Sequence, residues 1–314
     1  MVRPKDRHCA DALDAALAEF DAQVRRLPGI QSVARRQSFL EQLIESIHRV
    51  RYVAVIRGRP LSPLRGDPRS DLFDPLKAAI LRGREGNIEE AFWLVFIFVH
   101  FGRSARTGWR LARDIYGSLG ANRAWDWLRI RADTASFRRW LAAQQSALQG
   151  GDGITRRFGN HRKYQSLDAR STNGTGAAVE TYVRWVNPPR THQELMEEAR
   201  RESGNDPRQT FRHLYNSMDA VASFGRTAKF DYLTMIAKLG LARIEPDSTY
   251  MQGATGPLTG ARLLFGNSSG TAPLLERWLV DLEAHLPLDF GMQVLEDSLC
   301  NWQKSPEMFI PFRG

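Results

Sequence analysis

The chain has 314 residues, of which 42% are hydrophobic, and it carries a net charge of +9. This hydrophobic content is enough for a sizeable core, which excludes extensive disorder and fits one large domain or two smaller ones. The positive charge favours a polyanionic partner, and the alternative is a basic protein that is merely soluble.

The two cysteines, Cys9 and Cys300, lie far apart in the sequence and in no Cys/His cluster. We therefore expect neither a disulfide framework nor a zinc site, and no cofactor is predicted. The N-terminal residues are charged and lack an apolar run that ends in a cleavage site, so no signal peptide is expected. A reducing cytoplasm is the predicted location.

Apolar residues recur at spacings of three and four along most of the chain, without sustained alternation of period two. This pattern predicts an all-α, multi-helix fold. The first two helices are expected along the stripes Leu13, Leu17, Phe20, Val24 and Leu40, Leu43, Ile44, Ile47. Later helices are predicted near residues 71–82, 87–101, 105–119, 122–130, 134–148, 177–186, 191–203, 207–219, 222–239, 272–285 and 289–303.

One stretch, AFWLVFIFVHF at residues 91–101, is apolar enough to suggest a membrane span. A span needs roughly twenty apolar residues, and shorter runs are usually core helices. We therefore predict a buried helix here and no membrane partner.

Two glycine-rich stretches interrupt the helical pattern, near residue 150 and at residues 252–270. Such stretches are typical of loops, and the first divides the chain into helical halves of similar length. We predict a single helical catalytic domain over residues 1–314, with 1–150 and 151–314 as its possible lobes.

The charge surplus is concentrated in the middle of the chain. Between Phe101 and Lys163 there are thirteen arginine or lysine residues and four aspartate or glutamate residues, a surplus equal to that of the whole chain. Within this segment, RRFGNHRKYQ alternates cations with aromatics, as a surface that holds phosphates and stacks bases requires. The predicted nucleic-acid contacts are Phe158, Asn160, His161, Arg162, Lys163 and Tyr164; a solvated basic loop is the alternative.

The segment at residues 216–248 places an arginine in line with an apolar helical stripe. Phe230, Leu233 and Ala237 share one face, and one turn back lies Arg226. A buried guanidinium is costly unless it meets a carboxylate or faces a ligand. Arg226 is therefore predicted either to bind an anion or to pair with an acid, for which the candidates are Asp231, Glu245 and Asp247.

A second candidate lies on the last predicted helix. Glu296, Cys300 and Lys304 stack at a spacing of four beside its core stripe. A nearby cation lowers a thiol pKa and makes the nucleophilic thiolate more available. A lone cysteine beside Trp302 is also typical of a small buried hydrophobe, and both interpretations remain open.

No familiar catalytic motif is present, neither a phosphate-binding P-loop nor the motifs of zinc peptidases and serine hydrolases. The chain nevertheless resembles the alpha-glutamyl/putrescinyl-thymine pyrophosphorylase family of phage and bacterial DNA-modification systems. The resemblance covers most of the chain, through FLEQLIESIHRVRYV, FDPLKAAIL, EEAFWLVFIFVHFG, GWRLARDIYGSLG, RRFGNHRKYQSL, SFGRTAKFDYL, IEPDS and LEDSLCNWQK in that order.

The resemblance implies a transferase that acts on 5-hydroxymethyluracil in DNA, activated by phosphate or pyrophosphate on its exocyclic methylene. An amine from an amino acid or polyamine displaces that group and gives a hypermodified thymine. The family is also similar to helical DNA glycosylases, which implies an all-α fold and a base that leaves the stack.

This chemistry suggests roles for the candidate residues. Arg226, Arg162, Lys163 and His161 would stabilise the departing phosphate. A carboxylate among Glu245, Asp247 and Glu296 would accept the proton of the amine, and Cys300 could add to the pyrimidine ring. Asn160 or Asn216 would contact the pyrimidine edge, and the predicted substrate contacts also include Ser223 and Asp231.

Two other functions fit the same features. One is a base-flipping glycosylase, which would produce abasic sites. The other is a DNA-binding protein without catalysis, in which Arg226 would be no more important than any other phosphate contact.

Overall fold

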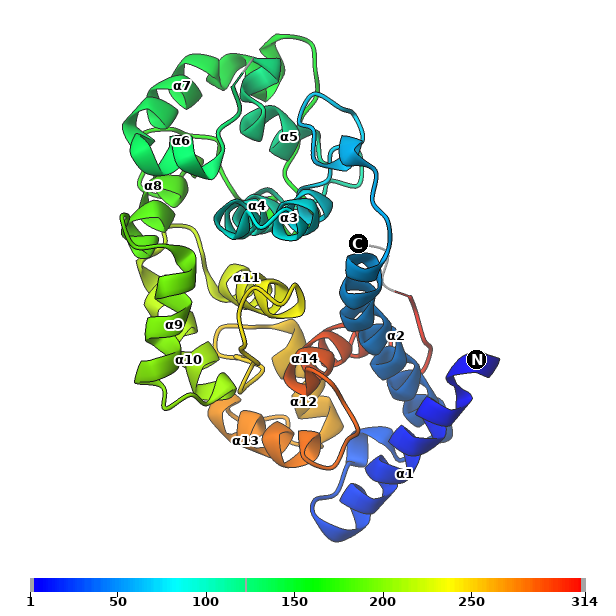
Figure 1. The fold of residues 1–314 in the computed structure, drawn as a ribbon. Helices are drawn as coiled ribbons and strands as arrows, with labels where there is room; N and C mark the ends of the chain where they lie inside the picture. The colour runs from blue at the N-terminus through cyan, green and yellow to red at the C-terminus, as the bar shows by residue number, and fades with distance from the viewer. Residues whose placement is uncertain (1–2, 122, 312–314) are drawn as a thin grey trace. The chain divides into compact units, whose positions relative to one another are not determined.

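The computed structural model describes residues 3–121 and 123–311 (Figure 1). Fourteen α-helices and several short 3-10 turns occur in these residues, and no β-strand does, which confirms the predicted all-α fold. The chain divides into two compact units. One comprises the residues up to Val55 together with those from Glu245 onward, and the other is Ile56–Ile244.

The helices of the first unit come from both ends of the chain. They are α1 (Arg7–Gln23), α2 (Val33–Gly58), whose last residues belong to the second unit, α12 (Gly256–Leu264), α13 (Ala272–Glu283) and α14 (Gly291–Trp302). The predicted stripe of the first helix is buried at Leu13, Leu17 and Phe20, whereas Val24 follows the end of α1 and is exposed.

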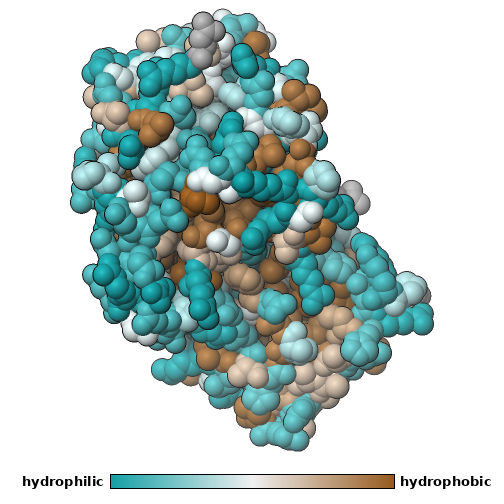
Figure 2. All heavy atoms as spheres, viewed as in Figure 1, coloured by the Kyte–Doolittle hydropathy of each residue, from teal (hydrophilic) through white to brown (hydrophobic). Residues whose placement is uncertain are grey.

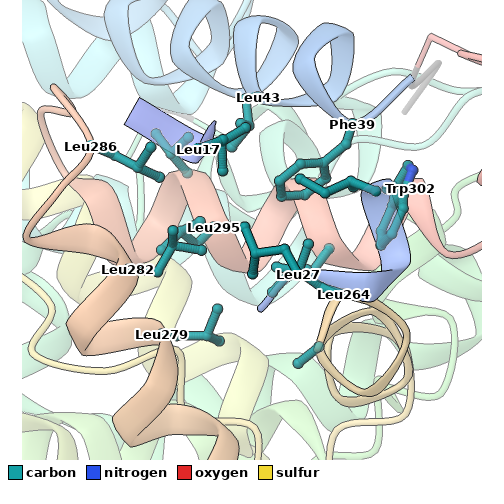
Figure 3. Close-up of a cluster of buried hydrophobic side chains, with 14 of the residues drawn as sticks. Leu17, Leu27, Phe39, Leu43, Leu264, Leu279, Leu282, Leu286, Leu295 and Trp302 are labelled. Carbon is teal, nitrogen blue, oxygen red and sulfur yellow. The ribbon is translucent and has the colours of Figure 1, made fainter. Parts of the chain in front are cut away.

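The core of this unit is mostly aliphatic, and aromatic side chains from both ends of the chain also contribute to it (Figure 3). Phe39 of α2 packs on Trp302 of α14 with ring centroids 5.0 Å apart. Leu17, Leu43 and Leu295 are fully buried in the same cluster. The apolar faces of α1, α2 and α14 therefore form one core, although about 230 residues of chain separate α2 from α14.

Helix α12 lies in the glycine-rich stretch that the sequence analysis treated as a loop. Its glycines serve close packing, because a Cβ on Gly256 would lie 2.7 Å from Cys300 Sγ and one on Gly260 2.4 Å from Leu299 O. The backbone of α12 thus touches α14 directly. The prediction was wrong because glycine lowers helix propensity locally, while tertiary packing decides the outcome.

The second unit contains the nine remaining helices. They are α3 (Pro75–Arg84), α4 (Ile88–Phe101), α5 (Arg110–Tyr116), α6 (Trp127–Ala132), α7 (Thr134–Ser146), α8 (Thr175–Val186), α9 (His192–Glu202), α10 (Pro207–Ser217) and α11 (Arg226–Lys238). The helix starts are specified locally: the side chains of Asn87, Asp126 and Thr191 accept hydrogen bonds from the first turns of α4, α6 and α9.

Helix α4 contains the apolar run and is buried along nearly its whole length, which confirms the predicted core helix. Trp93 and Phe96 stack at 5.1 Å, and the Trp93 indole N–H donates to Trp125 O at 2.8 Å. None of the described helices is both long enough and apolar enough to cross a membrane. The face shown in Figure 2 is mostly hydrophilic over α9 and α10.

A chain of polar side chains crosses the core of this unit. The Tyr182 hydroxyl lies 2.9 Å from that of Tyr232 and 2.7 Å from His192 Nε2, and His192 Nδ1 lies 2.8 Å from Glu89 Oε2. Burial lowers the pKa of His192, so the neutral ring accepts from Tyr182 and donates to Glu89. The side chains of Glu89, His192, Tyr182 and Tyr232 are thus hydrogen-bonded to one another, and they join α4, α8, α9 and α11.

Candidate nucleic-acid interface

The glycine-rich stretch near residue 150 is held in place by Arg156. Its side chain is 3% exposed and bonds to Asp114 Oδ2 at 2.6 Å, to Asp152 Oδ2 at 2.8 Å and to Ala147 O at 2.8 Å. The hydrogen bonds from Arg156 lower the pKa of Asp152 to about 2. The predicted lobe boundary near residue 150 consequently lies inside the second unit, where this arginine closes the loop.

Arg162 fixes the next part of the same loop. It is 8% exposed, and its guanidinium donates to Val99 O of α4 and to Asp231 Oδ2 of α11, both at 2.7 Å. Arg162 was predicted to bind phosphate, and the structure instead pairs its buried guanidinium with the partly exposed carboxylate of Asp231. Asp231, one of the predicted partners of Arg226, bonds to Arg162.

A second loop, residues 102–108, contacts the first one through backbone. Gly159 N donates to Phe101 O at 2.8 Å, and a Cβ on Gly159 would lie 2.8 Å from Arg103 N. The loop is closed by reciprocal hydrogen bonds between Ser104 and Gly108, at 3.0 and 2.9 Å. We call residues 102–108 and 156–164 the basic loop pair.

Four cations of the basic loop pair have no carboxylate partner within the described part of the chain. Arg103, Arg106, Arg157 and Lys163 are all exposed. Of these four, Lys163 alone was a predicted contact, and the three arginines entered only through the charge surplus. Two of these arginines lie in GRSARTG, a short stretch bounded by glycines, which was the signal available in the sequence. Which basic residues stay unpaired depends on tertiary contacts.

The aromatics of the loop differ in their surroundings. Phe158 stacks on Phe101 with centroids 5.7 Å apart and meets the edge of His100 at 6.1 Å. Burial lowers the pKa of His100 to about 3, and its neutral ring donates to Thr175 Oγ1 at 3.0 Å. Tyr164 is 89% exposed, with Lys163 Nζ 5.0 Å from its ring centroid. Tyr164 is therefore the more accessible surface for a base.

Arg226 is the first residue of α11, which agrees with its predicted place at a helix start. The helix follows Gly225, which has no side chain to cap the first amides. Ser223 lies just before it, with a φ of 61° and its hydroxyl donating to Asn173 O at 2.6 Å. Gln165, which directly follows residues 156–164, donates to Ser223 O at 3.3 Å, so this end of the basic loop pair lies close to the start of α11.

The other predicted contacts of this unit lie at its surface. Asn160 and His161 are exposed and form a 3-10 turn with the buried Arg162, and Asn216 is exposed near the end of α10. The structure thus joins Asn160 and His161 to Lys163 and Tyr164 in one short surface segment. The assignment of these side chains to phosphate or base remains a prediction.

The remaining candidates belong to the first unit. Asp247 is buried and accepts from the Tyr250 hydroxyl at 2.5 Å, and Glu245 is partly exposed two residues before it. Glu296 and Cys300 share a face of α14, and Cys300 packs against Gly256 of α12. Lys304 lies beyond the end of α14 and donates to Asn301 Oδ1 at 3.1 Å, so the helical stack of three ends at Cys300.

Among the described residues, no group of three or more His, Cys, Asp or Glu side chains is arranged to hold a metal ion. The geometry instead offers unpaired arginines and lysine, an exposed tyrosine and an uncapped helix start. These features suit binding of phosphorylated ligands.

Comparison with known proteins gives one match, which is to the model of a protein family. Neither the curated proteins nor the solved structures contain a significant match. The model of one family, described as alpha-glutamyl/putrescinyl thymine pyrophosphorylase clade 3, matches residues 34–314. Since that range is most of the chain and includes the basic loop pair and α11, the protein belongs to the alpha-glutamyl/putrescinyl thymine pyrophosphorylase family.

Proposed function

We propose that the protein transfers an amine to an activated thymine in DNA. The observation that carries the proposal is the family match over residues 34–314, because the name of the family denotes pyrophosphorylases of thymine hypermodification. The substrate is 5-hydroxymethyluracil whose exocyclic oxygen bears phosphate or pyrophosphate. The donor is an amino acid or a polyamine, and the product is a hypermodified thymine.

The reaction is a substitution without redox change. The amine nitrogen forms a bond to the C5 methylene, and the bond from that carbon to the phosphate oxygen breaks. Its electron pair leaves with the phosphate or pyrophosphate. The ammonium form of the donor first loses a proton to a base, so the enzyme must accept one proton and stabilise one anion.

The start of α11 suits the departing anion. Arg226 supplies a permanent positive charge at the first helical position, where the helix dipole also favours negative charge. Since Gly225 brings no capping side chain, the first amides of α11 can donate to a phosphate. Electrostatic catalysis requires donors of this kind to be aimed at the place where negative charge develops.

The proton acceptor is proposed among Glu245, Asp247 and Glu296. Asp247 accepts a hydrogen bond from the Tyr250 hydroxyl, which orients its carboxylate. Glu245→Gln, Asp247→Asn and Glu296→Gln test each carboxylate separately. The essential one would lose transfer and retain DNA binding. Cys300→Ser distinguishes covalent addition to the ring, which requires the thiol, from direct displacement, which does not.

The decisive experiment uses duplex DNA with 5-phosphomethyl- or 5-pyrophosphorylmethyl-deoxyuridine and a pool of amino acids and polyamines. After digestion, mass spectrometry of the nucleosides should show the mass of one donor gained and the phosphate lost. No gain with any donor contradicts the proposal, and abasic sites in the same DNA would identify a glycosylase.

Arg226→Ala is the first variant to compare in that assay. Loss of a preorganised anion-stabilising group lowers kcat by roughly 10²- to 10³-fold. Arg226→Lys retains the charge without the planar fork and should recover only part of the rate. Equal loss of turnover and of affinity for unmodified DNA would instead make Arg226 an ordinary backbone contact.

A further inference from the structure

The arginines around the basic loop pair fall into two groups. The side chains of Arg156 and Arg162 are buried. Arg156 forms ion pairs with Asp114 and Asp152, and Arg162 forms one with Asp231. These three carboxylates therefore already have a cationic partner. Arg103, Arg106, Arg157 and Lys163 remain exposed and outside any ion pair of the described residues. A group of unneutralised cations at a surface is typical of polyanion binding.

These cations extend from a backbone that is fixed before any ligand binds. Gly159 touches Arg103 N, Arg110 donates to Thr155 O at 3.3 Å, and the Ser104 hydroxyl accepts from the amides of Arg106 and Thr107, both at 3.3 Å. A fixed backbone reduces the entropy lost on binding. The two loops can therefore act as one surface.

The surface also contains an aromatic ring that has almost no protein contact. Tyr164 is 89% exposed, and the ammonium of Lys163 lies 5.0 Å from its ring centroid. An exposed ring beside cations is the arrangement by which proteins hold unpaired strands, since bases stack on the ring and phosphates meet the cations. In a continuous duplex the bases are already stacked, so this contact requires a base outside the helix.

We propose that the basic loop pair binds a DNA strand next to an unstacked base. Arg103, Arg106, Arg157 and Lys163 contact successive phosphates of that strand, and Tyr164 stacks on the exposed base. That the polyanion is DNA rests on the proposed function. The position of the surface rests on the contacts of the loops themselves.

The test measures affinity of the full chain for unmodified single-stranded DNA and for the matched duplex over a range of salt concentrations. Removing two phosphate contacts in Arg157→Ala/Lys163→Ala should reduce the slope of log K against log salt for the single strand by about 1.5. The matched control is Arg131→Ala/Arg201→Ala, which removes the same charge from exposed positions of α6 and α9. Equal slopes for the two doubles would overturn the proposal.

Two further variants separate arrangement from charge. Tyr164→Ala should weaken single-strand binding by roughly 5- to 100-fold and leave binding to the continuous duplex unchanged. Gly159→Ala keeps every cation but places a Cβ 2.8 Å from Arg103 N, and it should weaken binding by separating the loops. Wild-type affinity in both would also overturn the proposal; melting curves check that each variant is folded.

Binding to unmodified DNA does not depend on the reaction, so the two proposals can fail independently. If the wild-type protein transfers the amine and the loop variants bind DNA as tightly as the wild type, the proposed binding surface alone is wrong. Loop-dependent binding without transfer would overturn the transferase and leave the surface. A wild-type protein with no affinity for DNA would overturn both.

Discussion

The core of the second unit and its basic loop pair use their polar side chains in opposite ways. In the core, Glu89, His192, Tyr182 and Tyr232 form a continuous chain in which every buried polar atom is partnered. At the loops, Arg157 and Lys163 alternate with buried Arg156 and Arg162 and have no carboxylate partner in the described residues. Complete pairing of buried polar atoms is typical of a structural role. A group of exposed cations without acid partners is typical of a surface that binds an anionic ligand.

Among the tests of this comparison, the largest change in the free energy of unfolding is expected from the ionisation of Glu90. Burial raises its pKa to about 7 from an ordinary value of 4.5, although Tyr116 OH and Trp127 N donate to it at 2.8 and 2.7 Å. Below pH 4.5 the folded and unfolded forms are both protonated. As the pH rises from there through about 7, the unfolded state loses its proton first, and the free energy of unfolding falls by about 3 kcal/mol.

Urea unfolding at pH 5 and pH 8 measures this loss of stability. In Glu90→Gln, the free energy of unfolding should not show the fall that the wild type shows between these two pH values. Glu89→Gln is the matched control. Burial raises the pKa of Glu89, but the hydrogen bonds from His192 outweigh this effect and lower the pKa. The contribution of Glu89 to stability is therefore lost as the pH falls. A pH dependence in Glu90→Gln equal to that of the wild type would contradict the assignment.

Arg162 and Lys163 give the next contrast, between adjacent cations. Arg162→Ala leaves Val99 O without its donor and Asp231, whose side chain is 43% exposed, without its partner, at a cost of about 2–3 kcal/mol. Lys163→Ala should change stability by less than about 0.5 kcal/mol. Thermal and urea unfolding compare them, and similar losses would show that Lys163 is structural too.

The polar chain in the core gives a smaller contrast. Tyr182→Phe leaves both Tyr232 and His192 without their shared partner and should cost about 1–3 kcal/mol. Tyr232→Phe removes only the end of the chain and should cost about 1 kcal/mol or less. Unfolding at fixed pH measures both, and the reverse order would mean that Tyr232 has a further buried partner.

The smallest stability effects should come from the cations assigned to DNA. Arg103→Ala and Arg106→Ala should each leave the unfolding free energy within about 0.5 kcal/mol of the wild type. Each should also reduce the salt dependence of DNA binding by about one phosphate contact. A stable protein with weaker DNA affinity would confirm that this region is separate from the fold, and strong destabilisation would place these residues with Arg162.

Local sequence was sufficient for most of the fold. The apolar spacing of α4 and the caps at Asn87, Asp126 and Thr191 act within a few residues, so the helix positions follow from the chain itself. The same holds for Arg226 at the start of α11. Helix α12 was missed because Gly256 and Gly260 are favourable only against α14, a contact that local propensity does not contain.

The sequence by itself determined the helical class, the excess of positive charge before Lys163 and the family to which the chain belongs. Only the tertiary structure decided which of those charges are available to a ligand. Arg156 and Arg157 are neighbours of identical chemistry, yet one is buried on Asp114 and Asp152 and the other is exposed without an acid partner. The difference arises because Asp114, 42 residues away along the chain, and Asp152, four residues away, both reach the side chain of Arg156 and not that of Arg157.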